Sequence, residues 1–270
     1  MRERRRIFAM GGGGFAAPPG DPALDEYVLD VAERPNPRIC LLPTAGGDSE
    51  DQVRRFYAAY RSLPCEPTHL SLFRLGTRPV DVRSVLLAQD IVYVGGGSLL
   101  NLLAVWRAHG LESVLRDAWE RGVLLCGFSA GSMCWFRAGV TTSFGAPRPV
   151  PGLGFLPASN SVHRDSEPAR LSCYREAVRT EAVPPGYAVA DGVGLLFAGR
   201  DLTEAVSARA DAGAVWVEEI AGEAVESPLA VELLRAREAT TTLSIAEFRE
   251  ARSRRAAPNR PGIRRAGTAD

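Results

Sequence analysis

The segment VLLCGFSAGSMCWF, residues 123–136, places a serine where chemistry is expected. Four residues suited to a buried strand, 123–126, run into Gly-Phe-Ser-Ala-Gly, and apolar residues at helical spacing follow. When a strand turns abruptly into a helix, the residue at the apex is held in a strained backbone conformation and projects from the carboxyl edge of the sheet. Gly127 and Gly131 would relieve clashes with neighbouring elements. This context favours Ser129 as a nucleophile, against the alternative of a small residue that only permits the bend.

A serine hydroxyl needs a base within hydrogen-bond reach, and the sequence offers three histidines. His69 falls in an apolar run of strand length and His109 at the end of a helical pattern, so structural roles are expected for both. His163 lies in a polar loop after LGFLPASNSV, on the part of the chain that returns after the Ser129 strand. We therefore expect His163 to be the base.

Chain order restricts the carboxylate that would orient this histidine. Residues 130–162 contain neither Asp nor Glu, which excludes the Ser-acid-His order of α/β-hydrolases unless the acid comes from elsewhere in the chain. Asp191 is favoured because it ends a short apolar run that can return to the sheet edge, although it would also suit a hairpin turn. Asp165 and Glu167 are the other candidates, and both would also suit a helix cap.

Two further glycine-rich turns follow predicted strands. VGGGSLLNLL, residues 94–103, would expose free N–H groups at a helix amino end, as an oxyanion hole requires, or would serve only as a tight turn. MGGGGFAAPPG contains the pattern G-x-G-x-x-A at residues 11–16. The helix predicted from Asp21 begins too late to hold a pyrophosphate, and the second strand ends in LPT, where an acid for the ribose is expected. No cofactor is therefore expected.

The composition favours a small substrate. The 270 residues carry 32 basic and 32 acidic side chains, so the net charge of zero steers neither nucleic acid nor an anionic membrane toward the protein. Every basic residue is arginine, which excludes a Schiff base, a Ser-Lys dyad and a P-loop. Five cysteines without a C-x-x-C pair favour buried reduced thiols, and the scattered histidines favour no metal site. Neither a bilayer-spanning run nor a signal segment is found, so a cytoplasmic location is expected.

Apolar runs of strand length alternate with helical patterns in the first half of the chain. This alternation predicts an α/β fold with a doubly wound, mostly parallel sheet and helices on both faces. After residue 186, short β-rich segments predict antiparallel additions at one sheet edge. The predicted strands are residues 7–10, 39–42, 69–73, 91–94 and 123–126, and the predicted helices begin near Asp21, Ser49, Leu99 and Leu111.

We expect residues 1–250 to form a single catalytic domain that ends with a helix from Ser244. Residues 251–270 have no apolar periodicity and predict a disordered basic tail. The oligomeric state is open, with a homodimer among the options.

At these motifs the sequence resembles the peptidase E family, the aspartyl dipeptidase and cyanophycinase group of serine exopeptidases. The resemblance covers roughly residues 7–200 and is carried by MGGGGF, LLPTAGGDSE, SLF, YVGGGSLLNLL, VWRAHG, GFSAGSMCWF, LGFLP, the His163 loop with DSEPARL, and ADG. It implies a fold like class I glutamine amidotransferase domains, with serine where those enzymes carry cysteine. By position it implies Ser129 as nucleophile, His163 as base, Asp191 as orienting acid, and an oxyanion hole of N–H groups from Ala130 and Gly96 or Gly97.

The sequence also departs from the family pattern. The loop that commonly reads Cys-Pro-His-Tyr is Ser-Val-His-Arg at residues 161–164, and GGGN becomes GGGS at Ser98. Some members carry Glu at the acid position, so Asp191 would have a shorter reach. These changes put the transfer of the family's substrate in question.

The resulting hypothesis is a serine exopeptidase that removes the first residue of a dipeptide or short peptide through an acyl-enzyme. An acidic first residue would need a cation, for which Arg164 and Arg170 are candidates, and Glu167 would receive the amino group. The alternatives are an amidase or cyanophycinase-like hydrolase with the same catalytic residues, and a catalytically silent protein that binds a peptide or metabolite in the same crevice.

Overall fold

The computed structural model describes residues 5–17 and 22–234 of the 270-residue chain. The predicted cap Asp21, the helix predicted from Ser244 and the basic tail predicted for residues 251–270 lie outside these ranges. The described residues form an eight-stranded sheet and a six-stranded sheet.

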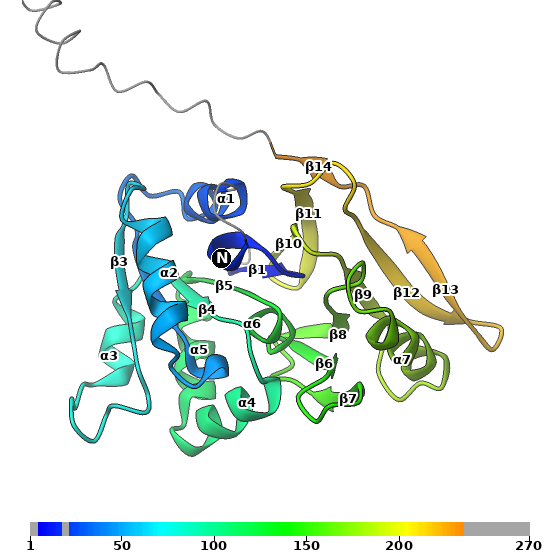
Figure 1. Cartoon of the computed structure of the whole chain (residues 1–270), viewed down its shortest axis with the longest axis horizontal. Helices are drawn as coiled ribbons and strands as arrows, with labels where there is room; N and C mark the ends of the chain where they lie inside the picture. The colour runs from blue at the N-terminus through cyan, green and yellow to red at the C-terminus, as the bar shows by residue number, and fades with distance from the viewer. Residues whose placement is uncertain (1–4, 18–21, 235–270) are drawn as a thin grey trace, which may run out of the picture. The chain divides into compact units, whose positions relative to one another are not determined.

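The larger sheet contains the parallel strands that the sequence predicts. These five strands lie in the order β1-β5-β4-β2-β3, and β10, β11 and β14 continue the sheet from β1 (Figure 1). Both β10 and β11 join antiparallel, as predicted for the chain after residue 186. The strands are β1 (Arg6–Met10), β2 (Arg38–Leu42), β3 (Glu66–His69), β4 (Ile91–Val94), β5 (Leu124–Phe128), β10 (Val193–Ala198), β11 (Asp201–Ser207) and β14 (Glu232–Leu233).

Helices cover both faces of this sheet, because alternate side chains of each strand point to opposite sides. Phe8 and Tyr93 pack with α1 and α2, whereas Ile7 and Val94 pack with α3, α4 and α5. The arrangement is the doubly wound α/β fold of class I glutamine amidotransferase domains. The helices are α1 (Ala23–Val31), α2 (Glu50–Tyr60), α3 (Val82–Leu87), α4 (Leu99–Ala108) and α5 (Leu111–Glu120).

The helix starts largely follow their predicted signals. Ser49 caps α2 and Ser98 caps α4, each by accepting a hydrogen bond from a main-chain N–H of the first turn. Gly110, with φ of +64°, separates α4 from α5. In α1, Pro22 occupies the N-cap position.

The smaller sheet was not predicted from the sequence. Its strands lie in the order β13-β12-β9-β8-β6-β7, with α7 (Pro168–Arg179) packed against it. Because β8 runs parallel to both β6 and β9, the carboxyl ends of β8 and β9 lie at one edge. The strands are β6 (Phe136–Thr141), β7 (Arg148–Pro151), β8 (Leu156–Ser161), β9 (Gly186–Val189), β12 (Ala214–Ile220) and β13 (Glu223–Pro228).

Some local predictions are wrong. The strand predicted for residues 69–73 is β3, which ends at His69, and His69 is exposed at the sheet edge and not in the core. The helix after Ser129, α6 (Ala130–Met133), has only four residues, and Phe136 already begins β6. Helix α3 was not predicted. Such short apolar runs are ambiguous because periodicity alone does not separate a buried strand from a helix.

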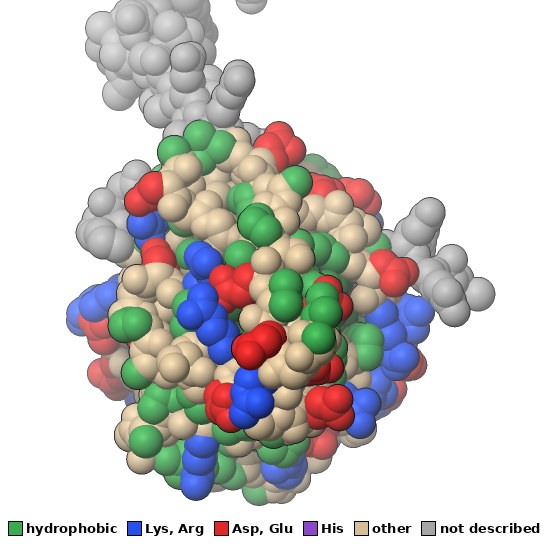
Figure 2. Space-filling view, turned by 90° about the vertical axis from the view of Figure 1, so that its right-hand side faces the viewer, with side chains coloured by type: hydrophobic (Ala, Val, Ile, Leu, Met, Phe, Trp, Pro, Cys, Tyr) green, Lys and Arg blue, Asp and Glu red, His purple; other side chains and the backbone are tan. Residues whose placement is uncertain are grey.

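The surface agrees with the balanced charge of the chain. Figure 2 shows acidic and basic side chains intermixed on the face where β12, β13 and α7 lie. Among the residues that the structure describes, no helix has the length and hydropathy to cross a membrane.

Candidate active site

Ser129 stands at the apex of the turn between β5 and α6, as its sequence context predicts. Its backbone has φ of +54° and ψ of −116°, a conformation that a non-glycine residue rarely adopts. The turn is held because the Ser129 N–H donates to the carbonyl of Met10 at 3.2 Å, and the Ser129 carbonyl accepts from the N–H groups of Ser132 and Met133. The side chain is partly exposed, so a substrate can reach it.

The two glycines that flank Ser129 are required by close packing against β4. A β-carbon on Gly127 would lie 2.6 Å from the Val94 carbonyl oxygen, and one on Gly131 would be closer still. Since both obstacles are main-chain atoms, neither can move aside. The sharp turn at Ser129 therefore needs glycine at both positions.

His163 follows β8 and faces Ser129. Its Nε2 lies 2.9 Å from Ser129 Oγ, and its backbone also has a positive φ, +58°. The loop that carries it is fixed because the Arg164 N–H donates to the Val189 carbonyl at 3.1 Å, and the Glu167 N–H donates to the His163 carbonyl at 2.8 Å. The ring is thus brought to Ser129 by a well-held turn.

Asp191 follows β9 and contacts the other ring nitrogen of His163. Its Oδ1 lies 2.5 Å from Nδ1, and its Oδ2 accepts a hydrogen bond from the Ser166 hydroxyl at 2.7 Å. The hydrogen bond with His163 lowers the pKa of Asp191 below its usual value, although burial acts in the opposite direction. An ionised carboxylate only accepts hydrogen bonds, so Nδ1 carries the ring proton and Nε2 is left to accept the Ser129 proton.

Asp165 and Glu167, the alternative acids, have other contacts in the structure. Asp165 Oδ1 accepts the main-chain N–H of Asp191 at 2.9 Å. Glu167 forms an ion pair with Arg170 at 3.1 Å and precedes Pro168, the first residue of α7. Asp191 is thus the acid that the structure places against the His163 ring.

A buried polar pair connects the Ser129 turn to the strand that leads to His163. The Asn160 amide on β8 donates to the Ser132 hydroxyl on α6 at 2.9 Å, and both side chains are fully buried. Breaking such a pair would leave a buried polar group without a partner, at a cost of about 1–3 kcal/mol. The pair therefore fixes α6 relative to β8.

A cavity of about 750 Å³ opens over these residues. Its walls are glycines and small or apolar side chains, and Arg209 supplies a cation. The lining residues are Gly12, Gly13, Gly14, Ala16, Ala17, Leu24, Gly96, Gly97, Phe128, Ser129, His163, Asp191, Gly192, Ala208 and Arg209.

The first glycine-rich turn contributes to this site, which the sequence did not predict. Gly12 lies beside Asp191 in an isolated parallel bridge, and its carbonyl accepts the Gly192 N–H at 3.0 Å. A β-carbon on Gly12 would collide with Asp191 Oδ1 and lie 3.1 Å from His163 Cε1. Gly12 thus leaves the room that the two side chains occupy. The run of four glycines after β1 was the only sequence signal for this role.

The second glycine-rich turn also lines this cavity. The Gln52 amide donates to the Gly96 carbonyl at 3.1 Å. Because a trans peptide is planar, the Gly97 N–H points away from that carbonyl. Gly97 has φ of +142° and packs against the Ala45 carbonyl. Gly96 and Gly97 both line the cavity, whereas Ala130 is buried at the start of α6, directly after Ser129.

The three predicted substrate-binding residues are not among the residues that line this cavity. Arg164 pairs with Glu226 on β13 at 3.3 Å. Arg170 is only 4% exposed, and its Nη2 donates to Thr142 Oγ1 at 2.7 Å. Its Nε and Nη1 are buried without a hydrogen-bond partner among the described residues.

The cysteines are free thiols in the structure. Cys40, Cys126 and Cys134 are buried as predicted, whereas Cys65 and Cys173 are partly exposed. Burial raises the pKa of Cys40 to about 12 and that of Cys65 to about 11. Within residues 5–17 and 22–234, no three His, Cys, Asp or Glu side chains gather in a way that would hold a metal ion.

Comparison with known proteins agrees with this site. Residues 7–205 match Peptidase family S51. The chain is 43% identical over 230 residues to the uncharacterized peptidase YgaJ of Bacillus subtilis (strain 168), which covers 85% of this chain and 99% of that protein.

Two solved structures share the fold. The crystal structure of a peptidase from an acI-B1 Actinobacterium matches with a TM-score of 0.64 at 18% identity, over 84% of this chain and 94% of its own. A protein from Listeria monocytogenes EGD-e, named as a candidate peptidase E, matches with a TM-score of 0.53 at 17% identity, over 74% of this chain and 96% of its own.

The contact of Gly12 with the His163–Asp191 pair predicts a large effect of one methyl group. In Gly12→Ala the new β-carbon would push Asp191 and His163 from their positions, and displacements near 1 Å cost about a hundredfold in rate. We expect a fluorophosphonate to modify Ser129 at least about tenfold more slowly, with the circular dichroism spectrum unchanged. Gly76→Ala is the matched control, because a β-carbon there has no neighbour within 4 Å. Equal rates in both variants would contradict this account of Gly12.

The raised thiol pKa values predict slow chemistry at every cysteine. At pH 8 the thiols of Cys40 and Cys65 remain protonated, and the pKa of Cys173 is also raised by burial. We expect Ellman's reagent to react slowly with the native protein and to titrate five thiols once guanidinium has unfolded it. A thiol that reacts at once in the native protein would contradict this expectation and would identify an activated cysteine.

Proposed function

Because the chain belongs to peptidase family S51, a family of serine peptidases, we propose that it is a serine exopeptidase that removes the first residue of dipeptides or short peptides. The observation that carries the proposal is the hydrogen-bonded chain from Ser129 Oγ through His163 to Asp191, at 2.9 and 2.5 Å. This is the arrangement by which a base activates a serine and a carboxylate orients the base. The proposed location is the cytoplasm, in keeping with an odd number of free thiols.

In the proposed mechanism His163 Nε2 takes the proton of Ser129 as Oγ attacks the carbonyl carbon of the scissile bond. Asp191 stabilises the imidazolium that forms. His163 then gives the proton to the leaving nitrogen, the C–N bond breaks, and the shortened peptide departs. A water molecule, deprotonated by His163, attacks the acyl-enzyme in the same way and releases the first residue.

Main-chain N–H groups stabilise the negative charge on the carbonyl oxygen in this proposal. The Gly97 N–H is favoured because the Gly96 carbonyl is held by Gln52 and the two groups of one peptide point in opposite directions. The N–H groups of Gly96 and Ala130 are the other proposed donors. Each such donor is worth roughly 3–4 kcal/mol of the barrier.

The size of the cavity supports a short substrate. About 750 Å³ falls within the roughly 300–1,000 Å³ of sites that enclose small ligands. The wall of glycines, Ala16, Ala17 and Leu24 offers an apolar surface to a side chain of the peptide. A dipeptide or short peptide therefore fits this space better than a long one.

Arg170 is the cation proposed to favour an acidic first residue. Arg170 is buried, and a charge-assisted hydrogen bond from its guanidinium would favour a carboxylate over a neutral side chain. Burial lowers the pKa of Arg170, and the nearby charges of Glu167 and Asp191 oppose this shift. Glu167, its ion-pair partner, is the proposed acceptor of the substrate's amino group.

Covalent labelling tests the proposed nucleophile. We expect a fluorophosphonate to label the protein, Ser129→Ala to abolish labelling, and Ser113→Ala, at an exposed serine of α5, to leave it unchanged. Asp191→Asn should lower turnover at least about a hundredfold, because Nδ1 then loses the acceptor that fixes the ring tautomer. A folded wild-type protein that is never labelled would favour the alternative of a silent binding protein.

A dipeptide screen tests the substrate preference. We expect Asp-Leu to be hydrolysed faster than Asn-Leu, Glu-Leu and Ala-Leu. Arg170→Gln should weaken Asp-Leu hydrolysis by about tenfold to a hundredfold in kcat/KM, since a hydrogen bond to a charged group is worth about 1.5–3 kcal/mol, and should spare Ala-Leu. Arg175→Gln is the matched control, because Arg175 lies on the same helix but pairs with Glu226. Hydrolysis of asparagine or simple amides in place of dipeptides would favour the amidase alternative.

A further inference from the structure

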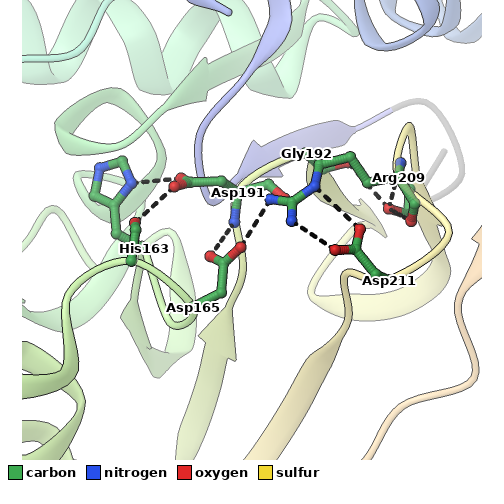
Figure 3. Close-up of polar contacts among 8 residues, drawn as sticks. His163, Asp165, Asp191, Gly192, Arg209 and Asp211 are labelled. Atoms are coloured by element: carbon green, nitrogen blue, oxygen red, sulfur yellow. Dashed lines mark hydrogen bonds and ion pairs between the residues drawn. The ribbon is translucent and has the colours of Figure 1, made fainter.

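Asp191 is held at its main chain as well as at its side chain. Its N–H donates to Asp165 Oδ1 at 2.9 Å, and its carbonyl accepts a hydrogen bond from Arg209 Nη1 at 3.4 Å. The same Nη1 donates to Asp165 Oδ2 at 2.8 Å, so Asp165 and Arg209 form an ion pair across the Asp191 backbone (Figure 3).

Arg209 is itself fixed in this position. Its Nε and Nη2 donate to the two carboxylate oxygens of Asp211 at 3.2 and 3.0 Å. Its main-chain N–H donates to the Ser207 hydroxyl at 3.0 Å, and that hydroxyl also reaches the carbonyl of Gly192, the residue after Asp191. Figure 3 shows the resulting row of contacts from His163 through Asp191 and Asp165 to Arg209 and Asp211.

Asp165 also links the acid to the turn that carries the base. It lies two residues after His163, within the turn that the Glu167 N–H closes on the His163 carbonyl. Two separate contacts thus hold Asp191 near His163: the hydrogen bond between their side chains, and the hydrogen bond from the Asp191 N–H to Asp165. A carboxylate this close to Asp191 would repel it, but Arg209 supplies the compensating charge.

We propose that Asp165, anchored by Arg209, is a positioning residue that sets the place of Asp191 and thereby the orientation of His163. The inference rests on the proposed function, because it assigns Asp165 a role in activating Ser129. Asp165 does not touch the reacting atoms. It acts on the rate through the Asp191 main chain, and substrate binding is left to other residues.

Removal of the Asp165 side chain tests this role. We expect Asp165→Ala to lower kcat and the rate of fluorophosphonate labelling by about tenfold to a hundredfold, with KM changed less than about threefold. A displaced catalytic group slows the chemical step, whereas substrate binding, which depends on other residues, is little affected. Asp165→Asn, which keeps an acceptor for the Asp191 N–H, should recover most of the loss. Asp117→Ala is the matched control, because Asp117 is exposed to a similar degree, 38% against 30%, and also pairs with a distant arginine, Arg83.

A double-mutant comparison separates positioning from a general structural effect. In an Asp191→Ala background, Asp165→Ala should cause no further loss, because the residue through which it acts is gone. An equal loss in both backgrounds would overturn the proposal. Thermal unfolding of each variant identifies a folding defect, and if Asp165→Ala unfolds early, the same comparison is made in both backgrounds with Asp165→Leu, which has a similar branched shape but no acceptor for the Asp191 N–H.

The outcomes distinguish this inference from the proposed function. If the wild type is labelled at Ser129 but Asp165→Ala is labelled equally fast, only the positioning role falls. If the folded wild type is never labelled, the proposed function fails and the positioning role fails with it.

Discussion

The proposed active site requires three side chains, each of which follows a different strand, to lie within hydrogen-bond distance of the next. Ser129 comes after β5 of the larger sheet, whereas His163 and Asp191 come after β8 and β9 of the smaller one. Hydrogen bonds at 2.9 and 2.5 Å tolerate little displacement. The meeting of the two sheets is therefore fixed by buried polar contacts, among them the pair of Asn160 and Ser132, and by glycines that let main chains approach closely.

The chemistry of this site could be predicted from the sequence because Ser129 and Asp191 follow apolar runs and His163 lies in a polar loop between them in chain order. Ser129 was marked by the glycines around it, His163 by its polar loop, and Asp191 by the absence of Asp and Glu from residues 130–162. Parallel strands end at a common edge, so the ends of such runs are where side chains can meet. The structure brings these three together as that argument requires.

What could not be predicted depends on contacts between distant segments. The smaller sheet was missed because β7 and β8 carry prolines and polar residues in place of an apolar run, and Phe136 also fitted a helical pattern. The roles of Gly12 and Asp165 depend on the position of Asp191 in the folded chain, and no local sequence pattern predicts that position. His69 was expected in the core, yet the buried residues there are Leu70 and Leu72, beyond the end of an exposed edge strand.

The backbone of Ser129 has a consequence for how this protein can evolve. At φ of +54° serine pays a steric penalty of about 1–3 kcal/mol that glycine would avoid. A lineage released from selection for hydrolysis would therefore gain stability by replacing this serine with glycine. Serine at this position therefore lowers the stability of the folded chain, as expected of a residue that serves for its reactivity.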